Sequence, residues 1–164
     1  MFVAAQRHGS VRAVPVKNDQ IAELRPVINK IISRKAELMS DGHRSYQRIG
    51  SNFATHDTVC HGKREYARGQ IHTNTAESFG ALLERTKLGV FHFLSSKHVH
   101  RYLNELEFRW DHRIPEEKIT RTGNKKIVMK PMPVLQMLSS LLSAAAGTQL
   151  RRTTNRGILS FNAV

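Results

Sequence analysis

The chain has 164 residues, enough for one domain with a buried core that needs no disulfide to support it. Lysine and arginine number 26 against 13 acidic residues, so the formal net charge is +13, well beyond the magnitude of about 2 to 8 usual for a small soluble domain. Such a charge favours a polyanionic partner, above all nucleic acid. Cys60 is the single cysteine, which excludes an intrachain disulfide, and no stretch approaches the roughly 18 apolar residues of a membrane span. We therefore expect a cytoplasmic protein with no membrane partner.

The first predicted elements are two short strands at 2–6 and 11–16, joined by a turn that contains Gly9 and typical of a hairpin. Asn18 or Asp19 can then cap a helix, because apolar residues recur at helical spacing over 21–32. Pro26 is tolerated there only near the start of the helix or at a kink.

A brief buried strand is predicted next, at 36–40, and it runs directly into Asp41 and Gly42. The carboxyl ends of strands are where open α/β sheets place their sites. The polar segment 51–71 is predicted to be a loop that contains one short strand near 57–60. Asp41 is therefore the first candidate site residue.

Two amphipathic helices follow in the second half of the chain. The first opens at Thr73 or Asn74 and ends before Gly89, and the second runs from Ser95 or Ser96 to a stop before Pro115. Beyond them we expect three further segments: a basic connector at 115–133, a short apolar helix near 134–146, and a disordered tail from 149.

Two acidic residues, Asp41 at a strand end and Glu77 in the first turn of a helix, stand out as metal ligands. Mg²⁺ prefers hard oxygen ligands and takes one or two of them from the protein, while phosphate and water supply the rest. Both residues also have ordinary interpretations. Asp-Gly is a common turn pair, and Asn74 with Glu77 resembles a helix capping box.

Motifs that stand in one order along the chain decide between these interpretations. They are SDGHRSY at 40–46, HGKREY at 61–66, HTNTAESF at 72–79, SKHVHRYLNE at 96–105 and FRWDHR at 108–113. The ordered set closely resembles the DDE transposase domain of bacterial insertion sequences, of the ISXO-two-like type. This resemblance covers about residues 2–114, so it divides the chain into a transposase-like domain at 1–114 and a basic C-terminal extension at 115–164.

The resemblance implies an α/β fold of the RNase H-like kind, in which a mixed sheet has helices on both faces. It also implies that Asp41 and Glu77 are the second and third catalytic ligands of a two-metal Mg²⁺ site. The implied activity is DNA transposition, in which water or a DNA 3′ hydroxyl attacks a phosphodiester, cutting the element ends and joining them to a target duplex.

This chain departs from the family pattern in several ways. The family's first aspartate lies on a strand that precedes the part matched by residues 2–6, so we expect a domain that lacks its first, central strand and one metal ligand. Without one ligand the attacking oxygen is misplaced, and a misplacement of about 1 Å already costs about 10²-fold in rate. We therefore expect catalysis to be impaired. On the family's catalytic helix, a lysine is replaced by Glu84 and a bulky aromatic residue by Gly80.

The missing strand also has structural consequences. Without it, two neighbouring strands have unpaired backbone groups, which are costly to bury. We expect lower stability, re-pairing of those two strands, or completion by another chain, either a second copy or a complementing transposase.

Basic side chains supply the candidate DNA contacts, although a solvated surface is an equal interpretation for any one of them. They are Arg44, Lys63, Arg64, Arg68, Lys97 and Arg101. His43 and His61 are expected to have ordinary polar roles, because Mg²⁺ prefers oxygen to imidazole. The alternative function is a non-catalytic DNA-binding transposase remnant. RNA binding ranks last, since no aromatic or glycine signature of an RNA module is present.

Overall fold

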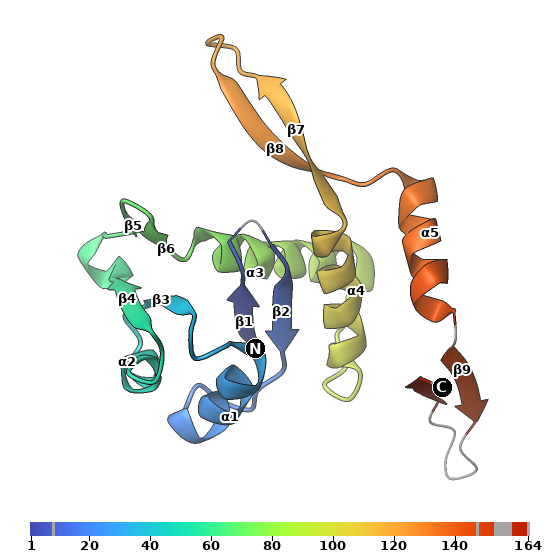
Figure 1. The fold of residues 1–164 in the computed structure, drawn as a ribbon, viewed down its shortest axis with the longest axis horizontal. Helices are drawn as coiled ribbons and strands as arrows, with labels where there is room; N and C mark the ends of the chain where they lie inside the picture. The colour runs from blue at the N-terminus through green and yellow to red at the C-terminus, as the bar shows by residue number, and fades with distance from the viewer. Residues whose placement is uncertain (8, 147, 153–158, 164) are drawn as a thin grey trace. The chain divides into compact units, whose positions relative to one another are not determined.

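The computed structural model describes residues 1–7, 9–146, 148–152 and 159–163, which form a mixed α/β structure (Figure 1). The chain divides into two compact units, Met1–Asp111 and His112–Val164. The helices are α1 (Ile21–Ile31), α2 (Arg44–Gly50), η1 (His61–Lys63, a 3₁₀ turn), α3 (Asn74–Thr86), η2 (Lys87–Phe91, a π-helical turn), α4 (Val99–Asp111) and α5 (Val134–Ala145). The strands are β1 (Phe2–Ala5), β2 (Val11–Val14), β3 (Glu37–Asp41), β4 (Thr55–Val59), β5 (Ala67–Arg68), β6 (Ile71–His72), β7 (Arg113–Ile119), β8 (Lys125–Pro131), β9 (Thr148–Arg152) and β10 (Leu159–Ala163).

The sheets of the first unit are all two-stranded in the described part of the chain. β1 and β2 form the predicted antiparallel hairpin, in which Phe2 is opposite Val14, and β3 and β4 pair in parallel. β1 and β3 are not paired with each other, so the predicted re-pairing of these two strands is wrong for this structure. Each strand pairs instead with its own neighbour, and both strands line one cavity, described below.

The β1–β2 hairpin has a hydrophobic cluster on each of its faces. On one face Phe2 packs with Leu24 and Ile28 of α1 and with Ile49 of α2. On the other face the cluster is made by Val11, Ala13, Phe79, Leu83, Leu103, Leu106 and Trp110, from β2, α3 and α4. Successive residues of a strand point to opposite faces, so one short hairpin contributes to both clusters.

The second cluster contains two aromatic residues, Phe79 and Trp110. Phe79 is fully buried, and its ring meets that of Trp110 edge to face, with centroids 5.5 Å apart and an interplanar angle of 77°. This is a favourable arrangement for two aromatic rings. The helices α3 and α4 are thereby fixed to the hairpin that they cover.

The second unit differs from the sequence prediction in one large feature. Where a connector was expected, β7 and β8 form an antiparallel hairpin that turns at Gly123, whose φ is +79°. The sequence does not predict these strands, because they contain many charged residues and two prolines. Pro115 and Pro131 nevertheless fit the hairpin, since both of its strands are edge strands, where proline is tolerated. The apolar helix predicted near 134–146 is confirmed as α5, which has no buried residue.

The C-terminal tail was expected to be disordered, and the structure describes β9 and β10 within it as an antiparallel pair. Residues 153–158 and 164 lie outside the described residues, so disorder there stays a prediction. In the described part of the chain, each helix is too short or too polar to cross a membrane.

Candidate functional site

Asp41 is the last residue of β3, at the strand end that the sequence predicts. Its neighbour Ser40 is buried, and the Ser40 hydroxyl lies 2.8 Å from Nε2 of His56 on β4, which fixes this end of the strand. The Asp41 side chain itself is exposed, and its Oδ1 accepts a 3.2 Å hydrogen bond from the backbone N–H of His43. The strand therefore presents an ionisable oxygen ligand at its carboxyl end.

His43 has the ordinary polar role expected of it. Its Nδ1 accepts from the backbone N–H of Ser45 at the start of α2, and its Nε2 lies 3.0 Å from the carboxylate of Asp19. The helix that it begins, α2, was not predicted, because a helix of seven residues is too short to show a clear periodic pattern in the sequence.

Glu77 lies in the first turn of α3, as predicted. Its carboxylate accepts a 2.6 Å hydrogen bond from the Thr73 hydroxyl and lies 3.3 Å from Nε2 of His61. The predicted capping by Asn74 is wrong: the N-cap is Thr73, and its side chain makes no cap hydrogen bond. The Thr73 hydroxyl is directed instead to the Glu77 carboxylate, which it orients together with His61.

One cavity of about 750 Å³ is lined by both predicted ligands. Asp41 and Glu77 both line it, along with Tyr46 and His72. His72 Nδ1 is buried and makes no hydrogen bond within the described part of the chain, so the cavity wall has an unsatisfied polar atom beside Glu77. Burial raises the pKa of Tyr46, and the nearby carboxylates of Asp41 and Asp19 raise it further, so this phenol stays protonated.

The oxygen ligands of this cavity suit a hard divalent cation, but their grouping does not form a complete metal site. The carboxylates of Asp41 and Glu77 match the one or two protein oxygen ligands that Mg²⁺ commonly takes, and Glu37 lines the same cavity. Among the described residues, however, histidine, cysteine, aspartate and glutamate form no cluster of three that could hold a metal ion. His61, for which we expect only an ordinary polar role, contacts Glu77 directly and belongs to the surroundings of this ligand.

The six basic residues predicted to contact DNA are all exposed, and the structure places them on three segments. Arg44 begins α2, whereas Lys97 and Arg101 lie just before and inside the start of α4. Lys63, Arg64 and Arg68 share the segment from η1 to β5, which leads through β6 into α3 and Glu77. Arg68 is also tied locally, because its guanidinium donates to the carbonyl oxygen of Thr58 at 3.2 Å.

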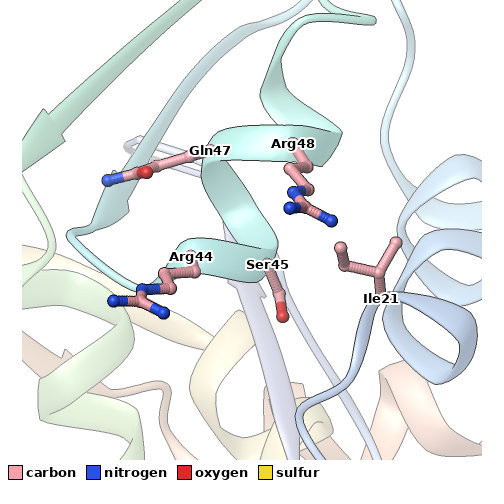
Figure 2. Close-up of a pocket in the computed structure, with 5 residues that line it drawn as sticks. All are labelled: Ile21, Arg44, Ser45, Gln47 and Arg48. Carbon is pink, nitrogen blue, oxygen red and sulfur yellow. The ribbon is translucent and has the colours of Figure 1, made fainter.

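A second hollow, of about 460 Å³, adds a basic residue that sequence reasoning missed. It is lined by Arg44, Ser45, Gln47 and Arg48 of α2 and by Ile21 of α1. Figure 2 shows the Arg48 side chain extending toward Ile21, while the Arg44 and Gln47 side chains extend away from it. Recognising α2 would have revealed Arg48, since it lies one helical turn after Arg44.

Comparison with known proteins identifies the family to which this domain is related. A family model described as an ISXO2-like transposase domain matches residues 1–111. A protein of Halobacterium salinarum, described as an uncharacterized protein in transposable element ISH50, is 31% identical over 87 residues, which are 52% of this chain and 30% of that protein. The chain thus spans under a third of this relative's length. No solved structure matches the chain. Since the family model covers about two thirds of the sequence, the chain belongs to the ISXO2-like transposase domain family.

Proposed function

We propose that the chain acts in DNA transposition as a DNA-binding, RNase H-like domain in which Asp41 and Glu77 bind Mg²⁺. In this proposal residues 1–114 form the partial catalytic domain, residues 115–164 form a basic extension, and the protein works in the cytoplasm. The observation that supports it is that Asp41, at the end of β3, and Glu77, at the start of α3, line one cavity of a transposase-family domain.

Several features of the fold support the RNase H-like interpretation. The order of elements is an antiparallel hairpin, a helix, a strand that ends in an acid, a parallel strand, and a helix with an acid in its first turn. Helices pack on both faces of the hairpin, as a sheet between two helical layers requires.

The residues of the site have separable tasks in this proposal. Asp41 and Glu77 would hold Mg²⁺, and a two-metal site would supply activation of the attacking oxygen by one ion and stabilisation of the leaving oxygen by the other. Thr73 and His61 hold the Glu77 carboxylate in place, and the backbone N–H of His43 holds that of Asp41. The basic segment of Lys63, Arg64 and Arg68, which precedes α3, would contact the phosphates of the element end and of the target duplex.

A second function is favoured by one observation. The carboxylates of Glu37, Asp41 and Glu77 all line the cavity, but among the described residues no three side chains of histidine, cysteine, aspartate or glutamate group as a metal site, whereas two-metal sites normally need a bridging carboxylate. This favours a non-catalytic, DNA-binding member of the family, in which the basic surface still binds duplex DNA without cleaving it.

One experiment separates the two functions. Nicking of supercoiled plasmid and binding of a short duplex would be measured with and without Mg²⁺ or Mn²⁺, for the wild type and for Asp41→Asn. The matched control is Glu84→Gln, which removes an exposed carboxylate from α3, the helix of Glu77.

Metal-dependent nicking that is lost in Asp41→Asn and kept in Glu84→Gln is the result expected of a catalytic domain. Salt-sensitive duplex binding without nicking, unchanged by metal, would support the non-catalytic function. Absence of both nicking and duplex binding would contradict the whole proposal.

A further inference from the structure

We propose that the hairpin of β7 and β8 is a DNA-binding arm that enters the major groove of a duplex. The hairpin lies in the second unit, beyond residues 1–111 that the family model matches. This inference rests on the proposed function for the kind of partner, duplex DNA. It involves neither the predicted metal ligands nor the basic segment from η1 to β5.

The hairpin is a long ribbon with two exposed faces. Each strand has seven residues, and all seven are paired across the hairpin (Figure 1). All of these residues are exposed except Arg113 and Val128, which are half-buried. An isolated two-stranded hairpin is only marginally stable in water. A partner that lies along the ribbon would therefore stabilise it.

The hairpin is strongly basic, and its two acidic residues are already paired. Residues 113–131 contain six lysines and arginines against two glutamates. The Glu117 carboxylate lies 3.3 Å from Nζ of Lys125, and the Glu116 carboxylate contacts Lys130. Each of these two lysines thus has its counter-ion within the hairpin.

Two other lysines stand directly opposite each other on one face of the ribbon. Lys118 of β7 is in register with Lys126 of β8, both residues are exposed, and neither forms an ion pair within the described residues. Residues placed in this way have Cβ atoms about 5 Å apart, and like charges there destabilise the strand pair. An anion bound between the two lysines would remove this repulsion.

The turn of the hairpin adds a third cation at the same end. The Thr120 hydroxyl accepts from the backbone N–H of Asn124 at 3.1 Å and donates to the Asn124 carbonyl oxygen at 3.0 Å, so the turn has a fixed shape. Arg121 lies in this turn and is exposed. The end of the ribbon therefore has three cations without a carboxylate partner in the described part of the chain, a suitable arrangement for binding several phosphates.

The shape of the ribbon favours B-form DNA as the source of these phosphates. A two-stranded ribbon fits the major groove of B-DNA, which is about 12 Å wide, whereas the major groove of an RNA duplex is too narrow and deep for side chains to read. Strands of seven residues extend about 23 Å, the length of about seven base pairs. The face with Lys118 and Lys126 would be turned to the DNA, because the opposite face has the exposed apolar residues Ile119 and Ile127.

The test compares two double variants of the full-length chain that have the same net charge. Lys118→Gln with Lys126→Gln removes the opposed pair, whereas Lys125→Gln with Lys130→Gln removes the two lysines that have glutamate partners. Circular dichroism first checks that both variants are folded. Binding to a fluorescently labelled DNA duplex of mixed sequence would then be measured by anisotropy over a range of NaCl concentrations.

We expect removal of the opposed pair to weaken binding by about tenfold or more and to reduce the slope of log affinity against log salt concentration by about two, since each phosphate contact accounts for about 0.9. The control variant should lose much less affinity and keep the wild-type slope. Equal losses in the two variants would overturn the proposal, because they would show only long-range attraction to a basic surface. If the first variant does not fold, Arg121→Gln in the exposed turn gives the same test, with the slope reduced by about one.

Two competitors and an RNA duplex test the choice of groove and of nucleic acid. Methyl green, which occupies the major groove, should abolish the difference in affinity between the wild type and the variant without the opposed pair. Netropsin, which occupies the minor groove, should preserve that difference, and the reverse result would overturn the groove assignment. An RNA duplex of the same sequence should bind both proteins equally, and an undiminished difference on RNA would overturn the choice of DNA.

Failure of this inference is distinct from failure of the proposed function. Salt-sensitive duplex binding that is unchanged by Lys118→Gln with Lys126→Gln would overturn the DNA-binding arm and leave DNA binding by the first unit intact. Absence of duplex binding by the wild type would overturn both.

Discussion

The carboxylate of Asp111, at the end of α4, accepts a 2.9 Å hydrogen bond from the backbone N–H of Val11, which lies 100 residues earlier in the chain. The same carboxylate pairs with Arg12 at 3.0 Å. These contacts attach the last turn of α4 to the outer edge of β2. The last helix of the first unit thus caps the edge of the hairpin with which the unit begins.

Asp111→Ala is therefore expected to lower the free energy of unfolding by about 1–3 kcal/mol, because the Val11 amide loses its acceptor. Urea unfolding followed by circular dichroism measures this value. The control is Glu105→Ala, which removes an exposed ion pair between Glu105 and Arg109 on the same helix and should cost no more than about 0.5 kcal/mol. Equal losses in the two variants would contradict the edge-capping role.

Phe79→Ala should destabilise the chain by about 3–5 kcal/mol, because Phe79 is fully buried and packs against Trp110. Trp110 is the single tryptophan, so its fluorescence reports the change directly: we expect emission at longer wavelength as water reaches the indole. Phe93→Ala, at a side chain that is 73% exposed, should change stability by about 0.5 kcal/mol or less. A similar loss in both variants would mean that the second cluster is not the core.

Gly80→Ala should raise the free energy of unfolding by about 0.5–1 kcal/mol. Gly80 lies in the middle of α3, and a Cβ added there would meet no atom within 4 Å. Gly50→Ala is the contrasting variant, since its Cβ would lie 1.9 Å from the His56 ring, which must then move. Chemical unfolding of the two variants should give shifts of opposite sign, and a stabilising Gly50→Ala would contradict the packing of His56.

The stability of the first unit should depend on the protonation of His56. Burial lowers the pKa of His56 below its ordinary value of 6.5, and the charge of Asp57 opposes this only in part. The folded chain then binds this proton less tightly than the unfolded chain, so the stabilisation is complete above pH 6.5 and is lost as the pH falls below it.

Unfolding free energies measured about one pH unit above and below 6.5 test this sign. The wild type should lose more stability on acidification than His56→Gln, whose amide can still reach the Ser40 hydroxyl. Using the difference between the two proteins removes the contribution of the other histidines. A larger loss in the variant would contradict the lowered pKa.

The parts of the fold that the sequence predicts well are those with strong local periodicity. α3 and α4 repeat apolar residues at helical spacing, and the hairpin of β1 and β2 has a turn with Gly9 between two β-prone runs. The position of Asp41 was predictable for a similar reason, because a buried run ends directly before an Asp-Gly pair.

The parts that were missed depend on contacts between distant residues. α2 is stabilised at its start by His43 and by Ser45, whose hydroxyl donates to the carbonyl oxygen of Asp19. These contacts cannot be predicted from a periodic pattern in the sequence. The role of Thr73 beside Glu77 also needed coordinates, because a threonine before Asn74 does not reveal which hydroxyl reaches the carboxylate.

Direct Mn²⁺ binding tests most simply whether Asp41 and Glu77 form one cation site. Calorimetric titration would be run on the wild type, Asp41→Asn, Glu77→Gln and Glu84→Gln, each first shown to be folded by circular dichroism. We expect either site substitution to weaken Mn²⁺ binding at least tenfold, while Glu84→Gln binds as the wild type does. Wild-type affinity in both site variants, or an equal loss in all three, would contradict a shared site.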